Sequence, residues 1–269
     1  MGTIGFVGSG NMAEALVKGV ITAKLYAPND VFVSDVRAER LEFLSAKYGA
    51  VAVQSNAELA AKVDTVVLSI KPQNMTDALN SIKDSIGSGA LVISIAAGIK
   101  VAKIAAVLGD MAIVRVMPNT PALVGEGASA LFANKKAKPL LKKAMSIFTS
   151  VGKAVVVDNE DLIDAVTAVS GSGPAYFFLL MEEMIKTGVE LGLPEAVAKD
   201  LVLQTAKGAG MLAAAADRNS ESPAQLRKKV TSPGGTTEAA IKVFAEGNIS
   251  KLISAAITRA RDRARELSK

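Results

Sequence analysis

The sequence predicts an α/β fold in which a doubly wound parallel sheet is followed by a second, all-helical domain. Two observations lead to this fold class. Up to about residue 157, short apolar runs alternate with segments of helical length, and beyond it almost only helical patterns remain. Half of the 269 residues are hydrophobic, which is enough for a sizeable core.

The strand-like runs follow one another in a regular order. They occupy residues 3–7, 31–34, 65–70, 90–95 and 112–116, with shorter runs at 128–133 and 154–157. Because the first five are apolar almost throughout, we expect helices to cover both faces of a parallel sheet. The two shorter runs extend this sheet to about residue 157.

The second part of the chain reads as helices at 175–191, 195–216 and 251–267, with a further helix that begins at Thr236 or Thr237 and continues through Val243. Alanine and glycine recur on these helices, which favours close packing between them. A helical domain of this size with so much apolar surface suggests a subunit interface. The predicted domains are therefore residues 1–158 and 159–269.

The first strand-like run ends in the sequence Gly8-Ser9-Gly10-Asn11-Met12-Ala13, which has the pattern G-x-G-x-x-A. Gly8 would make a tight turn, and Gly10 would let the backbone approach a pyrophosphate. The helix that follows would offer free N–H groups to the phosphates. This placement between strand and helix predicts a dinucleotide-binding domain of Rossmann type.

The end of the second strand carries groups that could select the cofactor. Asp35 lies about where an acidic residue would bind the adenosine ribose. Ser34, Arg37 and Arg40 stand close to it and could instead bind a 2′-phosphate. The sequence therefore leaves NADPH and NADH both open.

The composition excludes several kinds of chemistry. The chain has no cysteine and no histidine, so disulfides, thiol nucleophiles, histidine acid–base catalysis and His/Cys metal sites are excluded, and we expect no bound metal. The net charge of +5 is compatible with an anionic ligand. Acidic residues interrupt the basic C-terminal helix, so we expect no nucleic-acid partner.

We find neither a secretory leader nor an uninterrupted apolar run of spanning length, and expect a cytoplasmic protein without membrane contact.

The stretch Val230–Ala240, VTSPGGTTEAA, places two adjacent glycines directly before a helix. The glycines expose backbone N–H groups, and Thr236 or Thr237 begins the helix. N–H groups, hydroxyl groups and the positive end of a helix dipole then converge on one spot. This arrangement predicts a site for a carboxylate.

At this point the sequence resembles the pyrroline-5-carboxylate reductases, the enzymes of the last step of proline biosynthesis. The stretch VTSPGGTTEAAIKVF is similar to their signature. Further matches in the same order are IGFVGSGNMAEAL, SIKPQNM, ISIAAGI, RVMPNTPALVGEG and EDLIDAVTAVSGSGPAYFF. The resemblance covers nearly the whole chain. One departure is Lys229, where relatives often carry asparagine, which puts a cofactor contact from this position in doubt.

The family implies a helical domain that builds an intertwined homodimer, in some members assembled into a homodecamer. It also implies a dinucleotide cofactor, NADPH or NADH, and a cyclic imine carboxylate as substrate. The residues implied to line the cofactor, together with those deduced above, are Gly8, Ser9, Gly10, Asn11, Met12, Ser34, Asp35, Arg37, Asn56, Ser69, Ile70, Lys71, Pro72, Ala97 and Asn119. Those implied for the substrate are Glu160 and, from the partner subunit, the loop with Ser232, Gly234, Gly235, Thr236 and Thr237.

The implied chemistry agrees with the missing histidines. An imine that is protonated on nitrogen supplies its own electrophilic activation, so orientation and electrostatics can suffice for catalysis. We expect Ser232, Gly234, Gly235 and Thr236 to bind the carboxylate and the Thr237 hydroxyl to contact the ring nitrogen.

Two alternatives were weighed against this function. A β-hydroxyacid dehydrogenase would need a lysine soon after the Gly-rich turn near residue 171, but none occurs before Lys186. A non-catalytic dinucleotide sensor would have no need of an intact anion loop.

Overall fold

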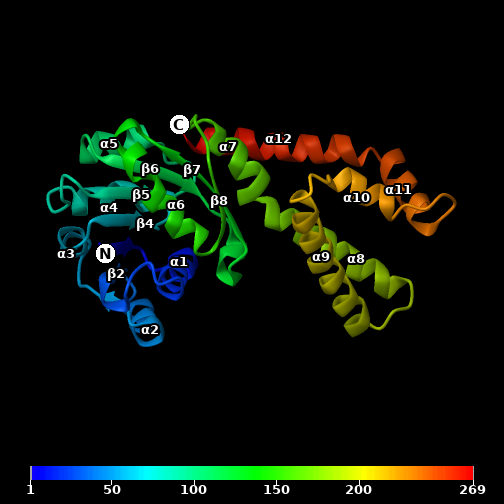
Figure 1. Cartoon of the computed structure of the whole chain (residues 1–269), viewed down its shortest axis with the longest axis horizontal. Helices are drawn as coiled ribbons and strands as arrows, with labels where there is room; N and C mark the ends of the chain where they lie inside the picture. The colour runs from blue at the N-terminus through cyan, green and yellow to red at the C-terminus, as the bar shows by residue number, and fades with distance from the viewer. Residues whose placement is uncertain (1, 269) are drawn as a thin grey trace. The chain divides into compact units, whose positions relative to one another are not determined.

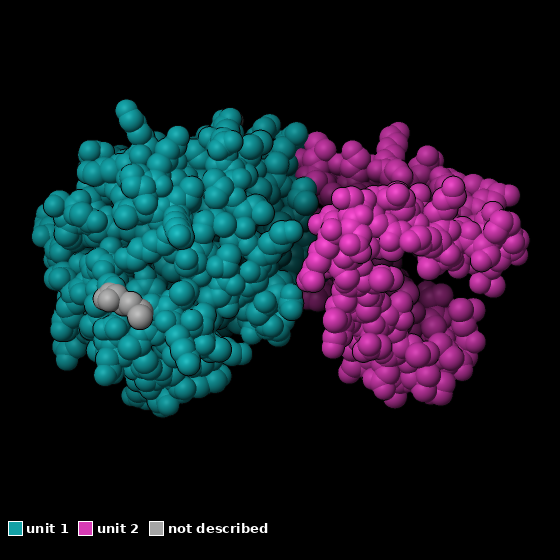
Figure 2. Space-filling view, viewed as in Figure 1, with its two compact units in different colours: residues 1–174, 259–269 teal, residues 175–258 magenta. Residues whose placement is uncertain are grey.

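The computed structural model describes residues 2–268 and contains two compact units. Unit 1 comprises residues 1–174 and 259–269, and unit 2 comprises residues 175–258 (Figure 2). The strands, all in unit 1, are β1 Ile4–Val7, β2 Val31–Ser34, β3 Val51–Ala52, β4 Thr65–Leu68, β5 Leu91–Ser94, β6 Ala112–Met117, β7 Gly127–Ala133 and β8 Gly152–Val156.

The α-helices alternate with these strands and then continue alone (Figure 1). They are α1 Asn11–Thr22, α2 Ala38–Tyr48, α3 Asn56–Lys62, α4 Met75–Ile82, α5 Val101–Leu108, α6 Leu141–Thr149, α7 Leu162–Val166, α8 Gly173–Glu190, α9 Glu195–Asp217, α10 Pro223–Lys229, α11 Thr236–Glu246 and α12 Ile249–Leu267. Short 3₁₀ helices lie at Pro28–Asp30, Pro72–Asn74, Thr120–Val124 and Lys135–Leu140, and a π-helical turn at Thr167–Gly171.

The strands form one sheet in the order β3-β2-β1-β4-β5-β6-β7-β8. The first six strands have the order of a dinucleotide-binding fold, which confirms the predicted fold class. All neighbours pair in parallel except β6 and β7. The link Pro118–Glu126 between those two strands is too short for a crossover helix, so β7 has to return antiparallel.

Helices cover both faces of this sheet, as the apolar strands predict. One core cluster joins α1, α2 and α6 to one face through Leu16, Leu44 and Phe148. A second cluster joins α3, α4 and α5 to the other face through Leu59, Leu79 and Ile104. The carboxyl ends of β1, β2 and β4 are thereby held in register, and the loops that follow them share one edge.

The division into compact units differs from the predicted boundary at residue 158. Ile163 and Asp164 of α7 are buried, and α7 packs on β6 and β7. The end of α12 also returns to unit 1, because Ser268 reaches Asp164 at 3.4 Å. The predicted boundary marks the point where strand-like runs end in the sequence. The boundary of the compact unit lies further along the chain, because α7 and the end of α12 pack on the sheet domain.

The helical residues 162–190 are long and apolar enough, by length and composition alone, to cross a membrane. No such stretch was expected from the sequence. Only 22% of its most apolar window is buried. A helix that joins two subunits has the same composition and the same exposure, so this stretch carries no assignment to a membrane.

Candidate functional site

The glycine-rich loop after β1 has the backbone geometry that its sequence predicts. Gly8 has φ +93°, and its N–H donates to the carbonyl of Ser34 at 2.8 Å. A β-carbon at Gly8 would lie 2.7 Å from the Ser69 carbonyl oxygen, so a side chain has no room there. Gly10 precedes α1 with φ −72°, and a β-carbon there would meet nothing within 4 Å. The free space is therefore at Gly10, where the backbone would approach a bound phosphate.

A cleft of about 800 Å³ opens beside this loop. It is bordered by the segments that follow β1, β2 and β4, by the start of α3 and by one face of α4. Nine predicted cofactor residues line it, namely Gly8, Gly10, Ser34, Asp35, Arg37, Asn56, Ser69, Ile70 and Lys71. The carboxyl edge of the sheet thus brings together residues that lie up to 63 positions apart in the sequence (8 to 71).

Six predicted cofactor residues do not border the cleft. Ser9 is fully buried, Asn11 and Met12 lie in the first turn of α1, and Pro72 begins a 3₁₀ turn. Ala97 and Asn119 lie in the loops after β5 and β6. Those two loops follow the strands on the far side of the strand-order reversal, where the second half of a dinucleotide would lie.

Sequence reasoning missed part of the cleft wall. Asn74, Asp77, Ala78 and Ser81 line it, together with Val7 and Val36. From Asn74 the next two positions, 77 and 78, are three and four residues on, and Ser81 is three and four residues beyond Ala78 and Asp77, which is the spacing of one helix face. That spacing could have identified them had the orientation of α4 been known.

Asp35 is bound by groups of its own chain. Its Oδ2 accepts the N–H of Ser9 at 2.6 Å, and its Oδ1 accepts both the backbone N–H and the Nε–H of Arg37 at 3.0 Å. Burial raises the pKa of Asp35, but the hydrogen bonds from Arg37 and Ser9 outweigh burial and lower it overall. The carboxylate is therefore ionised at neutral pH, and it fixes the glycine-rich loop to the end of β2.

The two arginines considered for a 2′-phosphate have different positions. The Arg40 guanidinium donates to the Ser9 carbonyl and to Glu14, each at 2.9 Å, and Arg40 does not border the cleft. The Arg37 side chain borders the cleft and is 50% exposed. Arg37 is thus the arginine available to an anion in the cleft, whereas Arg40 supports the loop from behind.

Glu14 is the centre of this support. It accepts hydrogen bonds from Arg40, from the Tyr48 hydroxyl at 3.0 Å and from Lys47 at 3.2 Å. Burial raises the pKa of Glu14, but these three hydrogen bonds together lower it. The first turn of α1 is in this way tied to α2.

Two further sets of hydrogen bonds fix the cleft wall. The Ser34 hydroxyl donates to Asn56 Oδ1 at 2.8 Å, and Asn56 Nδ2 donates to the Ser81 hydroxyl at 3.0 Å. The Ser69 hydroxyl lies 2.7 Å from the Gly8 carbonyl oxygen. Strand ends, α3 and α4 are therefore linked around the cleft before any ligand binds.

The loops after β5 and β6 are also held within unit 1. Asn119 Oδ1 accepts the N–H of Ala128 at 2.8 Å, and its Nδ2 donates to the Ser170 carbonyl at 3.2 Å. Glu160, expected to contact the substrate, accepts the N–H of Val101 at 2.8 Å and pairs with Arg115 at 3.1 Å. Both contacts are made by Oε1 of the Glu160 carboxylate.

The SPGGTT loop lies in unit 2 and has the predicted form. Gly234 has φ +72°, and α11 begins at Thr236. The N–H of Gly234 donates to the Glu238 carboxylate at 2.8 Å. Ser232, Gly234 and Thr236 are exposed, and Gly235 and Thr237 are half-buried. The loop therefore holds a carboxylate already, from its own helix.

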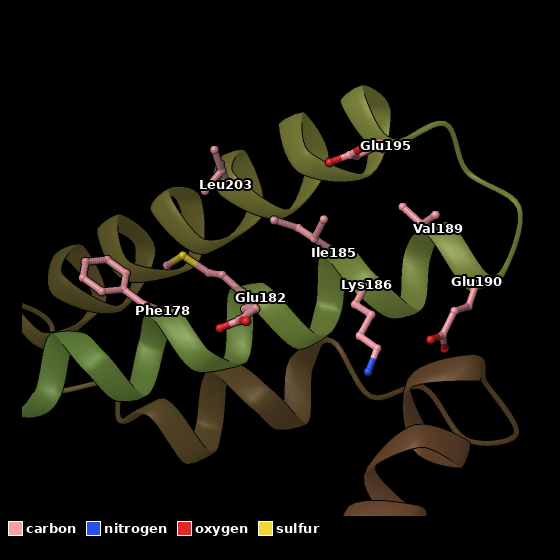
Figure 3. A pocket seen from close by; sticks show the side chains of 9 residues that line it. Phe178, Glu182, Ile185, Lys186, Val189, Glu190, Glu195 and Leu203 are labelled. Atoms are coloured by element: carbon pink, nitrogen blue, oxygen red, sulfur yellow. The ribbon is translucent and has the colours of Figure 1, made fainter.

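An apolar groove of about 620 Å³ runs between α8 and α9 of unit 2 (Figure 3). Phe178, Ile185 and Val189 lie on the side of α8 that faces α9, whereas the Lys186 ammonium points away from α9. The carboxylates of Glu182, Glu190 and Glu195 border the groove. Phe177, Phe178, Leu201 and Leu212 are all more than half exposed, so much of the apolar surface of unit 2 is uncovered in a single chain.

Within residues 2–268, no group of three or more histidine, cysteine, aspartate or glutamate side chains could hold a metal ion. The polar side chains at the cleft are instead amides, hydroxyls, two carboxylates and two cations. Such groups suit an organic ligand that carries phosphates and hydroxyls.

Comparison with known proteins finds relatives along the whole chain. A family model described as pyrroline-5-carboxylate reductase dimerisation matches residues 160–267. Another, described as coenzyme F420-dependent NADP oxidoreductase, matches residues 3–98. A pyrroline-5-carboxylate reductase of Pseudomonas aeruginosa is 44% identical over 267 residues, which cover 98% of this chain and 96% of that protein.

Two solved structures extend the comparison. That of a pyrroline-5-carboxylate reductase from Coxiella burnetii has a TM-score of 0.92 and 43% identity, covering 100% of this chain and 99% of the other. That of the Plasmodium falciparum pyrroline carboxylate reductase, described as having NADP bound, has a TM-score of 0.87 and 31% identity, covering 99% and 98%.

Proposed function

The chain belongs to the pyrroline-5-carboxylate reductase family, and we propose that it reduces 1-pyrroline-5-carboxylate to L-proline with NADPH as preferred cofactor. The observation that carries this function is the full-length similarity to pyrroline-5-carboxylate reductases. The cleft beside the glycine-rich loop and the hydrogen bond from Gly234 to the Glu238 carboxylate support it. The β-hydroxyacid dehydrogenase and sensor alternatives are not favoured by these relatives.

The residues at the cleft fit a dinucleotide cofactor. The space over Gly10 admits a pyrophosphate, and the N-terminus of α1 presents free N–H groups to it. Arg37 supplies a half-exposed cation for a 2′-phosphate, which supports NADPH. The Asp35 carboxylate beside it opposes the same phosphate, so we expect NADH to be accepted as well. When bound, the reduced nicotinamide supplies a hydride.

The chain's own residues then have to bind the substrate and orient its imine carbon toward the nicotinamide. We assign the substrate carboxylate to the Gly234 N–H and the hydroxyls of Ser232 and Thr236. The hydrogen bond that the Gly234 N–H donates to the Glu238 carboxylate supports this role. The expected contact from Gly235 is not kept, because its N–H donates to the Ser232 carbonyl at 3.0 Å. We assign the Thr237 hydroxyl to the ring nitrogen, where it would orient the protonated imine.

We propose a homodimer as the smallest active assembly. The exposed apolar surface of unit 2 and the dimerisation match support it, and the SPGGTT loop would then serve the cleft of the partner subunit. Ile185→Asp in the α8–α9 groove should shift the protein toward monomers in size-exclusion chromatography with light scattering. Lys186→Gln is the matched control, because Lys186 borders the same groove, its ammonium points away from α9, and the change keeps a polar side chain. The same measurement distinguishes a dimer from a decamer.

We place the enzyme in the cytoplasm.

The first experiment follows the oxidation of NADPH and NADH by purified protein with pyrroline-5-carboxylate. Saturable turnover supports the proposed reaction and ranks the two cofactors. Folded, oligomeric protein that turns over neither cofactor would contradict it and favour the sensor alternative. Thr237→Ala should lower kcat and leave cofactor affinity nearly unchanged, and an equal loss of both would contradict the role of Thr237.

A further inference from the structure

A buried arginine lies next to the loop that follows β6. Arg115 is on β6, two residues before the strand ends at Met117, and its side chain is 1% exposed. One guanidinium nitrogen contacts Glu160 at 3.1 Å, and the other contacts Asp164 at 3.4 Å. Arg115 is thus enclosed by two carboxylates from the segment that follows β8.

Each carboxylate binds a second segment as well. Glu160 Oε1 accepts the N–H of Val101, the first residue of α5, at 2.8 Å. Asp164, whose side chain is 3% exposed, lies 3.4 Å from the Ser268 hydroxyl at the end of α12. One guanidinium therefore links β6, the start of α5, α7 and the C-terminal turn, which lies beside α7 in Figure 1.

The C-terminal turn makes a further contact with the loop after β5. The Leu267 carbonyl oxygen lies 2.9 Å from the position that a β-carbon on Gly98 would take. Gly98 has φ +73°, so both its conformation and this neighbour require glycine. The loop between β5 and α5 is in this way enclosed by Glu160 on one side and by the C-terminal turn on the other.

The loop after β5, which this network holds, lies at a defined place in the sheet, next to the loop after β6. The cleft follows β2, β1 and β4, and β5 and β6 come next in the strand order. A dinucleotide bound across the strand-order reversal extends from the first group of strands toward the second. The loops 95–100 and 118–121 are therefore where its nicotinamide half has to lie.

We propose that Arg115 is a positioning residue for hydride transfer. Through Glu160, Asp164 and the C-terminal turn, it fixes the loop after β5, against which the nicotinamide ring is oriented. This inference rests on the proposed reductase function. Buried ion pairs often add little to stability compared with apolar replacements, whereas they do restrict geometry, and geometry is what this reaction needs.

The test uses substitutions that leave the buried charges balanced. Asp164→Asn keeps the shape of the side chain and leaves Arg115 paired with Glu160, so the protein is expected to fold. Arg115→Lys keeps the charge but cannot contact both carboxylates in the same way. The matched control is Asp161→Asn, because the Lys100–Asp161 pair joins the same two segments at the surface, at 3.1 Å, and the Asp161 side chain is 64% exposed.

Three quantities are measured on each full-length variant. They are kcat with its primary isotope effect from cofactor deuterated at the transferred position, the Kd of NADP⁺, and the Kd of adenosine 2′,5′-bisphosphate, which contains only the adenosine half. We expect Asp164→Asn to lower kcat by about tenfold or more, because small displacements of reacting groups have effects of this size. The isotope effect should increase, and the Kd of NADP⁺ should rise. The bisphosphate Kd should stay within about twofold, as for distant sites.

Two results would overturn the proposal. One is a kcat that falls only in proportion to the amount of active protein, with an unchanged isotope effect, because that is the signature of a purely structural role. The other is a variant whose kcat and Kd values equal those of Asp161→Asn. If the unmodified protein has no turnover, the proposed reaction fails, but the ratio of the two Kd values still tests the positioning of the loop.

Discussion

Replacing Gly8 with alanine and replacing Gly10 with alanine should affect different properties of the protein, although the two glycines belong to one short loop. At Gly8 the backbone has φ +93°, and the new β-carbon would lie 2.7 Å from both the Ser69 carbonyl oxygen and a methyl group of Ile70. At Gly10 the backbone has φ −72°, and the new β-carbon meets nothing. The first substitution should therefore affect folding, and the second should affect only ligand binding.

The cost of Gly8→Ala has two parts. A left-handed backbone costs an ordinary residue roughly 1–2 kcal/mol. An additional carbon in a packed site costs about 1–3 kcal/mol. The loop has little freedom to relax, because the Gly8 N–H is bonded to Ser34 and its carbonyl to the Ser69 hydroxyl. The sum of about 2–5 kcal/mol corresponds to a fall in Tm of roughly 4–20 °C for a unit of this size.

Gly10→Ala should leave the free energy of unfolding within about 1 kcal/mol of the unmodified protein, because alanine adopts this conformation without strain. Its methyl group would occupy the space that a pyrophosphate needs, and a loss of at least about tenfold in NADP⁺ affinity corresponds to only 1.4 kcal/mol. The assay combines thermal unfolding with calorimetric titration of NADP⁺. The reasoning is refuted if Gly10→Ala binds NADP⁺ as tightly as the unmodified protein, or if Gly8→Ala is equally stable.

Three further changes test other parts of the site. Asp35→Asn should raise the affinity for NADP⁺ relative to NAD⁺, because an ionised carboxylate beside Arg37 is removed, and an unchanged ratio of the two Kd values in calorimetry would contradict this. Glu238→Gln should lower the KM for the imine several-fold, since the Gly234 N–H no longer holds a competing carboxylate; a higher KM in steady-state assays would show that Glu238 supports the loop instead. The pKa of Glu14 is lowered below 4.5 in the folded protein, so its stabilising effect is present above that pH and is lost as the pH falls through the lowered pKa. Between neutral and acidic pH, the Tm of Glu14→Gln should therefore fall less than the Tm of the unmodified protein. Equal falls in Tm would contradict the role of Glu14.

The sequence was sufficient for the features that depend on local pattern. The apolar runs predict the strands of the parallel sheet, and G-x-G-x-x-A predicts the turn whose Gly8 and Gly10 have the geometry described above. The adjacent glycines before Thr236 likewise predict the start of α11. In each case the constraint acts over a few residues, so it is visible in the sequence.

Features that depend on distant partners could not be predicted in this way. The Ser9 N–H and Asp35 are 26 residues apart, and Arg40 and Glu14 are also 26 apart, so nothing local shows that one arginine supports the loop while the other faces the cleft. Strand β3 contains only two residues, too few for a pattern. Similarly, Glu160 could be assigned to the substrate only by resemblance, because its contact with Arg115 spans 45 residues.

The missing histidine also bears on why the polar groups around the cleft are bound to one another. A reaction that needs acid–base catalysis would require a side chain free to exchange protons, whereas hydride transfer to a protonated imine requires fixed positions. Asp35 holds Ser9, Ser69 holds Gly8, and Asn119 holds the loop after β6, each by hydrogen bonds within unit 1. Because these side chains are committed to the backbone of the loops, they cannot serve as proton carriers. Their contribution to catalysis has to be geometric, which is why we expect conservative changes at these positions to reduce kcat without changing the shape of its pH profile.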